Sequence, residues 1–334
     1  MPSNPIDAVI TWVNGNDPDH QKKRALWQPR SGADAPNAII PTRFADDGEI
    51  YYCLISILHY APFIQNIFIV TDNQHPKHLN AIAAAAPNTQ IRVIDHQEIF
   101  RGYENYLPSF NSTTIETLLY RINDLSEHFI YFNDDFFLNA PVTVNDFFRA
   151  GQPVIYGKQQ STIPTLVKHK LKRTTQRLLH QPSQVSYLYK QAKSAQLIGS
   201  PIFIRVGHTP RALRKSTFEQ FFSQHPMLLE QQLVHRFRHP EQFHAIALAH
   251  LLDRLYNRAI LLPDPPQFYL KPSSDLQRQL QLLDCEDIKF GCIQSLDLFT
   301  ATDRQLIKSH LFRKFAASLP QALESILRST HGNS

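Results

Sequence analysis

The sequence predicts an α/β fold: a mostly parallel, Rossmann-like sheet with helices on both faces, followed by a helical C-terminal portion. Up to about residue 150, apolar β-branched runs alternate with segments of helical periodicity, as in parallel sheets covered by helices. Four of these runs end in acidic or amide residues, which favours a binding crevice at the carboxyl ends of the strands. Beyond residue 150 the pattern is less regular and mostly helical.

The first strand is expected at residues 6–13 (IDAVITWV), where an apolar run ends in a turn-rich loop at residues 14–18. A helix beginning after Asn111 or Ser112 has a capping residue at either position and Glu116 in the place of a capping box. The remaining elements expected in the first half are strands at 67–70, 91–94 and 129–132, and helices at 49–59, 79–86 and 113–121.

The second half is expected to be mixed and mostly helical. The pattern predicts strands at 201–206 and 288–293, a helix at 243–258, and two amphipathic helices between 303 and 327, separated near Pro320. We therefore predict a nucleotide-binding half at residues 1–150 and a half at 151–334 that completes the site. The two halves would form one compact domain.

The composition limits the classes of partner. The chain has 334 residues, of which 43% are hydrophobic and 11% aromatic, enough to build a sizeable core. A formal net charge of +5 favours a polyanionic substrate, a nucleotide or an anionic membrane surface. The sequence has no ribonucleoprotein motif, zinc-finger spacing or basic heptad region, so a nucleic-acid partner is not expected.

Cysteine usage and hydropathy predict a cytoplasmic location. Three irregularly spaced cysteines, Cys53, Cys285 and Cys292, indicate reduced thiols rather than disulfides or a zinc site. Residues 1–5 lack the plan of a signal peptide, and no stretch approaches the ~20 apolar residues that span a bilayer. We expect a soluble protein or one peripheral to the inner face of the cell membrane. The basic segment at 166–177 is the candidate contact, with an ordinary exposed helix as the alternative.

Two adjacent carboxylates, Asp134 and Asp135, follow Asn133 at the end of an apolar strand. Carboxylates at such a position suit a hard cation, Mg²⁺ (or Mn²⁺), which in turn binds a diphosphate. The alternative is a surface turn capped by carboxylates. Large apolar residues flank the two acids, and because uncompensated burial of acids is costly, a metal site is favoured.

Two further positions after expected strands could carry chemistry. In the turn after the first strand, Asn14 and Asp17 offer polar contacts and Gly15 permits close approach of a ligand, with an ordinary turn as the alternative. His208, between a strand and a helix, could accept a proton or bind phosphate, although a structural histidine is the more common case.

A basic cluster at residues 235–239 (HRFRH) offers arginine forks for phosphate oxygens at Arg236 and Arg238. The alternative is a solvated basic helix face. Glu241 and His244 have the spacing of a metal motif, but the motif has no second copy, so no metal is expected there.

Several of these segments together resemble one family. Residues 6–18 (IDAVITWVNGNDP) resemble the first conserved region of Stealth proteins, and residues 110–137 (FNSTTIETLLYRINDLSEHFIYFNDDFF) resemble the second nearly end to end. Arg43 with residues 46–49 and residues 70–76 (VTDNQHP) add to the likeness, and residues 207–210 and 235–238 are similar to the third region. The resemblance covers most of residues 6–260.

The Stealth family includes bacterial capsule phosphotransferases and the animal enzyme that marks lysosomal glycoproteins with N-acetylglucosamine-1-phosphate. The resemblance implies a glycosyltransferase-A-like sheet that binds a UDP-sugar and an oligo- or polysaccharide acceptor. The implied reaction transfers hexose-1-phosphate to an acceptor hydroxyl and releases UMP. Two alternatives stay open: an ordinary metal-dependent glycosyltransferase that releases UDP, and a non-catalytic sugar-binding subunit of capsule assembly.

The resemblance also implies roles for single residues. Asp134 and Asp135 would bind the metal and the donor diphosphate, with His208 and Arg238 near the transferred phosphate and His208 or Asp17 as the base. The implied substrate contacts are Asn14, Asn16, Arg43, Asn111, Ser112, Glu116, Asn133 and Arg236. The fourth family region usually carries an Asn-Asp pair, but here the comparable stretch has Gln294 and Ser295. Asp297 is then the candidate for the displaced metal ligand.

Overall fold

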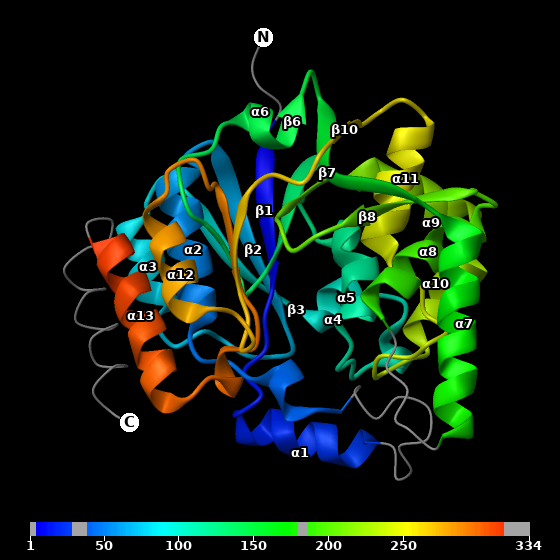
Figure 1. Ribbon diagram of the computed structural model, residues 1–334, viewed down its shortest axis with the longest axis horizontal. Helices are drawn as coiled ribbons and strands as arrows, with labels where there is room; N and C mark the ends of the chain where they lie inside the picture. Colours follow the sequence, from blue (N-terminus) through cyan, green and yellow to red (C-terminus); the bar gives the residue numbers. More distant parts are fainter. Residues whose placement is uncertain (1–4, 29–38, 180–185, 317–334) are drawn as a thin grey trace.

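The computed structural model describes residues 5–28, 39–179 and 186–316 (Figure 1). Its central sheet has five strands in the order β3-β2-β1-β4-β9. The first four are parallel and β9 is antiparallel to β4, so the predicted mostly parallel sheet is confirmed. The strands are β1 (Ile6–Thr11), β2 (Ile64–Thr71), β3 (Gln90–Asp95), β4 (His128–Asn133) and β9 (Arg211–Arg214).

Helices cover both faces of this sheet, as predicted (Figure 1). In β1, Ile6, Ala8 and Ile10 pack on one face and Val9 on the other. Strands buried on both faces read as continuous apolar runs, which is the pattern at residues 8–10, after the buried Asp7. The first face is covered by α2 (Glu49–Tyr60), α3 (Leu79–Ala85), α12 (Leu276–Gln281) and α13 (Ala301–Phe315); the second by α4 (His96–Ile99), α5 (Ser112–Leu118), α9 (Lys215–Gln224), α10 (Pro226–Leu233) and α11 (Ala245–Leu255).

A small sheet begins immediately after β4. Its order is β11-β12-β5, and β5 (Phe136–Leu138) follows β4 after only Asp134 and Asp135. These two aspartates therefore form the connection between the central sheet and the small one. The other strands of the small sheet are β11 (Gln267–Leu270) and β12 (Phe290–Ile293).

The second half contains more strands than its sequence predicts. The expected strands at 201–206 and 288–293 correspond to β8 (Ile202–Val206) and β12. Four other strands of this half were not predicted: β7 (Gln152–Ser161), β9, β10 (Ile260–Leu262) and β11. The longest of these, β7, pairs with β6, β8 and β10 in a further sheet, while β9 completes the central sheet. The remaining strand there is β6 (Phe148–Arg149). The division at residue 150 stays a prediction.

Among the described residues, no helix combines the length and the apolar character needed to cross a bilayer. Of the two helices predicted between 303 and 327, α13 is the first, and Pro320 with the second lies outside the described residues. The other elements are α1 (Pro18–Trp27), α6 (Val144–Phe147), α7 (Thr162–Leu178), α8 (Tyr187–Leu197) and 3₁₀ turns at Pro41–Phe44, Glu104–Tyr106, Leu119–Arg121, Leu282–Asp284 and Leu296–Leu298.

Candidate active site

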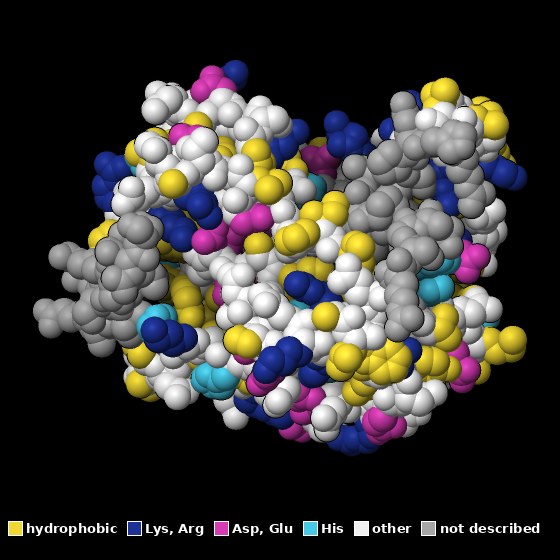
Figure 2. Space-filling view, turned by 90° about the horizontal axis from the view of Figure 1, so that it is seen from below, with side chains coloured by type: hydrophobic (Ala, Val, Ile, Leu, Met, Phe, Trp, Pro, Cys, Tyr) yellow, Lys and Arg dark blue, Asp and Glu magenta, His cyan; other side chains and the backbone are white. Residues whose placement is uncertain are grey.

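A cavity of about 760 Å³ lies at the carboxyl ends of the parallel strands. Thr11, Val70 and Asn133, at or near the ends of β1, β2 and β4, contribute to its wall. This is the edge at which open α/β sheets bind ligands. Figure 2 views the molecule from this side and shows basic and acidic side chains near one another around the centre of the face.

Asp134 and Asp135 form an acidic wall of the cavity. Burial raises the pKa of Asp135 to about 6, and burial together with Asp135, Glu49 and Asp46 raises the pKa of Asp134 well above its ordinary value. Asp135 Oδ2 accepts a hydrogen bond from the Cys292 thiol at 3.6 Å, while its Oδ1 is buried without a partner. An unpartnered carboxylate oxygen among other acids fits a hard cation.

The predicted third ligand, Asp297, lines the same cavity, but its Oδ2 accepts a hydrogen bond from the Thr42 hydroxyl at 2.7 Å. Among the described residues, Asp134, Asp135 and Asp297 do not bring three ligand atoms within 4.8 Å of one another. Gln294 and Ser295 also line the cavity; the Gln294 amide contacts the Tyr269 hydroxyl, and Ser295 has a left-handed φ of 58°. The geometry thus supports a paired-carboxylate site without Asp297.

Four basic side chains, Arg43, Lys190, Arg211 and Arg238, line the cavity as well. Arg238 Nη2 donates to Ser112 Oγ at 2.7 Å, and Lys190 Nζ donates to Thr113 Oγ1 at 3.0 Å. Burial, followed by the charge of Arg238, lowers the pKa of Lys190 to about 7. A buried group of cations that lower one another's pKa favours an anionic ligand.

Glu116 is buried beside these cations, and its Oε2 lies 3.4 Å from Nε2 of His244. Burial raises the pKa of Glu116, whereas the charges of Arg238, Arg211 and Lys190 lower it. One buried carboxylate does not neutralise three arginines and a lysine that is partly protonated near pH 7, so the basic wall keeps excess positive charge for a ligand.

His208 lines the cavity and contacts two tyrosine rings. Its ring stacks on Tyr269 at a centroid distance of 4.8 Å and an interplanar angle of 13°, and the Tyr187 ring lies at a centroid distance of 6.4 Å. Burial and the nearby charge of Arg211 lower the pKa of His208 to about 4. The imidazole is therefore neutral near pH 7 and can accept a proton.

Five predicted site residues do not line this cavity: Asn14, Asn16, Asp17, Asn111 and Arg236. Asp17 caps α1, where its Oδ1 accepts from the backbone N–H groups of Asp19 at 3.0 Å and His20 at 2.8 Å. Gly15 approaches the backbone of Phe44 rather than a ligand: its N–H donates to the Phe44 carbonyl at 2.7 Å. Asn14 Oδ1 accepts from the backbone N–H of Asn16, which itself lines a neighbouring cavity of about 260 Å³.

The other two of these five hold loops in place. Asn111 is buried, caps α5, and donates through Nδ2 to the carbonyl of His235 at 2.8 Å. Arg236 lies 4.0 Å above the Trp27 ring and donates to the carbonyls of Asn105 and Leu107. Both residues thus have partners within the protein, and their contacts with a substrate stay a prediction.

The structure adds Lys190, Arg211, Glu49 and His244 to the candidates. The sequence named His244 only in the metal spacing with Glu241 that was set aside, and it did not single out Lys190 or Arg211. Glu49 belongs to the acidic stretch at 46–49, and burial raises its pKa to about 8. Arg211 follows His208 by three residues and returns a hydrogen bond to the Gly207 carbonyl at 2.8 Å. Lys190 has no local signal, because only the packing of α8 brings it to the cavity.

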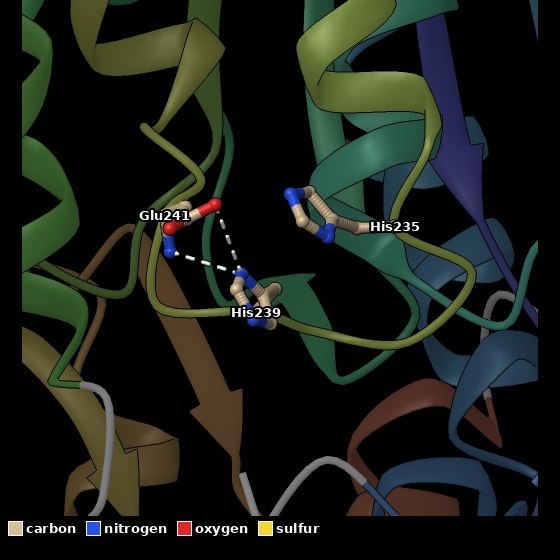
Figure 3. A group of neighbouring side chains, drawn as sticks. All are labelled: His235, His239 and Glu241. Carbon is tan, nitrogen blue, oxygen red and sulfur yellow. Dashed lines mark hydrogen bonds and ion pairs between the residues drawn. The ribbon is translucent and has the colours of Figure 1, made fainter. Parts of the chain in front are cut away.

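A second group of possible metal ligands is formed by His235, His239 and Glu241, outside the lining of the cavity (Figure 3). The two rings stack at 4.2 Å with an interplanar angle of 10°, and Glu241 Oε2 lies 3.9 Å from His239 Nδ1. Nearly parallel rings direct their lone pairs along parallel planes, so they converge poorly on one cation. Lys193 Nζ, which contacts the Glu241 carbonyl, adds a competing positive charge.

The chain matches two family models, described as Stealth protein conserved region 1 at residues 4–31 and conserved region 2 at residues 43–155. The second region contains Asp134 and Asp135. The predicted likeness of residues 207–210 and 235–238 to a third region rests on their motifs alone.

Curated relatives agree with these matches. The capsular polysaccharide phosphotransferase fcs1 of Haemophilus influenzae is 36% identical over 236 residues, covering 70% of this chain and 61% of the relative. The exopolysaccharide phosphotransferase SCO6021 of Streptomyces coelicolor is 31% identical, covering 94% of this chain and 55% of the relative. The exopolysaccharide phosphotransferase cps2G of Lactiplantibacillus plantarum is 34% identical, covering 70% and 71%. The chain thus spans between half and three quarters of the length of these relatives. The family-model matches and the identities to these relatives together show that it belongs to the Stealth family.

Proposed function

We propose that this protein transfers hexose-1-phosphate from a UDP-hexose, such as a UDP-N-acetylhexosamine, to a hydroxyl of an acceptor glycan and releases UMP. The product would be a phosphodiester-linked capsular or exopolysaccharide. The names of the relatives, capsular and exopolysaccharide phosphotransferases, support the glycan phosphotransfer.

One observation carries it: a single cavity has two adjacent carboxylates on one wall and four basic side chains on the others. A nucleoside diphosphate sugar needs both, since a cation bridges its diphosphate to carboxylates and basic groups bind the remaining oxygens. Asp134 and Asp135 would hold Mg²⁺ (or Mn²⁺), which when bound would offset the charge of the leaving phosphate. Phosphoryl transfer depends mostly on such positioning and charge stabilisation.

In the proposed reaction the acceptor oxygen attacks the phosphorus that bears the sugar. The new bond joins this oxygen to phosphorus, the bond from that phosphorus to the bridging oxygen of the diphosphate breaks, and UMP leaves with the bridging oxygen. Arg238 and Arg211 would bind the phosphate oxygens in this step. Lys190 would add positive charge at the same wall.

The geometry favours His208 over Asp17 as the base that takes the proton of the acceptor hydroxyl. His208 lines the cavity and is neutral near pH 7, whereas the carboxylate of Asp17 accepts two backbone hydrogen bonds at the start of α1. The rings of Tyr187 and Tyr269 would fix the imidazole in one orientation.

The test is to incubate the protein with Mg²⁺, a panel of UDP-hexoses and capsule oligosaccharides, and to identify the released nucleotide. UMP together with a phosphorus-31 diester signal in the product is expected. An Arg238→Gln variant should lose most of the activity, and the exposed-surface variant Arg278→Gln should retain it.

Two other outcomes of this assay would each contradict the proposed reaction and indicate a different function. UDP with a phosphorus-free product would identify an ordinary glycosyltransferase that attacks the anomeric carbon. Binding of the donor without turnover, at every acceptor tested, would identify a sugar-binding subunit.

A further inference from the structure

Helix α7 stands at the edge of the molecule, away from the central sheet (Figure 1). Its surface carries a stripe of exposed apolar side chains. We call Ile163, Val167, Leu171 and Leu178 the α7 stripe; their exposed fractions are 68%, 50%, 64% and 75%. Spacings of four and seven residues place all four on one side of a helix. Exposed apolar side chains gathered on one side of a helix mark a contact surface.

The opposite side of α7 is the one that packs against the protein. Leu166 contacts the apolar cluster that includes Phe203 and Ile204, and the ring of His169 lies 5.7 Å from that of Tyr189 on α8. The helix thus already has an inner apolar contact. The α7 stripe is additional to it.

The stripe lies among exposed lysines, Lys168, Lys170 and Lys172. Within the described residues, no ion pair joins any of the three to a carboxylate. The stretch at residues 147–218 contains thirteen lysines and arginines and no aspartate or glutamate. Because the whole chain has a net charge of only +5, the basic charge is concentrated in this stretch.

The strands that flank α7 continue the basic character. Lys158 on β7 and Arg205 on β8 are both exposed and directly opposite each other in the β7–β8 pair. Like charges in opposed positions are unfavourable unless an anion lies beside them. Arg173 on α7 likewise lowers the pKa of Lys193 on α8, after the larger effect of burial.

We propose that α7 binds the surface of an anionic lipid bilayer, with the α7 stripe inserted among the acyl chains and the lysines on the headgroups. An apolar stripe combined with flanking lysines is the pattern of helices that lie in the membrane interface. A soluble anionic glycan would account for the lysines alone, because it offers nothing to cover the stripe. Since α8 packs against α7 and supplies Tyr187 and Lys190 to the cavity, the bilayer would hold the cavity close to its surface.

The experiment is sedimentation of the full chain with vesicles of phosphatidylcholine alone or mixed with phosphatidylglycerol, at low and high salt. Binding is expected only with phosphatidylglycerol and should weaken as salt rises. The triple variant Lys168→Gln, Lys170→Gln, Lys172→Gln should bind on the order of a hundredfold more weakly, at about fivefold per lysine. The variant Val167→Asp, Leu171→Asp should lose binding as well.

Matched variants separate this effect from a general one. Lys22→Gln, Lys77→Gln and Lys271→Gln remove the same charge from exposed positions elsewhere, and Met227→Asp changes an apolar residue that is 75% exposed on α10. Both should bind like the unchanged protein, and thermal unfolding checks that every variant is folded. Neither readout depends on catalysis, so failure of the proposed reaction would not affect them.

Three results would overturn the proposal. The first is equal binding to both kinds of vesicle, and the second is full binding by the lysine variant. The third is a self-associated chain that becomes monomeric on Val167→Asp, Leu171→Asp, since a second copy would then be what covers the α7 stripe.

Discussion

At the scale of single residues, Asp135 has an oxygen available to a cation, and a bound cation would offset the cost of its burial. Its Oδ1 lacks a hydrogen-bond partner, and burial raises its pKa to about 6. We predict that Asp135→Asn, which keeps the shape of the side chain, lowers kcat on the order of a hundredfold or more. The reason is that a bound cation stabilises charge in the transition state by several kcal/mol.

The measurement is the steady-state rate as a function of Mg²⁺ concentration. Asp275→Asn is the matched control, because Asp275 caps α12 at an exposed position and asparagine caps a helix equally well. Near-normal turnover by Asp135→Asn with Mg²⁺ would rule out the metal role of this carboxylate.

The residues that sequence could identify are those whose signal is local. Asn133, Asp134 and Asp135 follow an apolar run directly, so their place at a strand end can be predicted from a dozen residues. Lys190 reaches the cavity only because α8 packs beside it, and no periodicity encodes that approach. Asp17 and Asn111 are the opposite case. Aspartate and asparagine are common in binding sites but are also among the commonest helix N-caps, and in the structure these two residues cap α1 and α5.

At the scale of elements, the small sheet supports the acidic wall, and its packing depends on Gly291. Gly291 on β12 is opposite Phe137 on β5, and an added Cβ would lie 2.2 Å from the Phe137 ring. Phe137 is buried, so its ring has no room to move. We predict that Gly291→Ala lowers the free energy of unfolding by ~1–3 kcal/mol, measured by chemical denaturation.

Gly207→Ala is the control for this change, because an added Cβ there meets only side-chain atoms at 3.8 and 3.9 Å. Its free energy of unfolding should change by no more than about 0.5 kcal/mol. Equal stability of the two alanine variants would contradict the packing argument.

The elements that sequence predicts well are long and buried on both faces, as β1 and β2 are. The strand β9 (RALR) was missed because it has four residues, two of them arginines, and becomes a strand only by pairing with β4. The strand β7 ends in a polar run whose pairing with β8 is likewise set by tertiary contacts. The second half is mostly helical as predicted, but the sequence missed the strands whose formation depends on distant partners.

At the scale of the whole molecule, the acidic wall links metal binding to folding stability. A carboxyl whose pKa is raised on folding binds its proton more tightly in the folded state than in the unfolded state. Without a cation, the contribution of Asp135 therefore becomes more favourable as pH falls through about 6, and less favourable as pH rises. A cation requires the ionised form, so its affinity should change in the opposite direction.

We predict that saturating Mg²⁺ raises the Tm by a few degrees at pH 8, since a ligand at a hundred times its Kd stabilises the folded state by about 2.7 kcal/mol. The rise in Tm should be much smaller at pH 5, where Asp135 is mostly protonated and binds the cation weakly. Comparing Tm with and without Mg²⁺ at each pH cancels the titration of groups that do not bind the metal. In Asp135→Asn the rise in Tm caused by Mg²⁺ should be the same at pH 5 and pH 8. In Asp275→Asn the rise should still be larger at pH 8. Equal shifts at pH 5 and pH 8 in the unchanged protein would show that Mg²⁺ binds somewhere other than this pair of carboxylates.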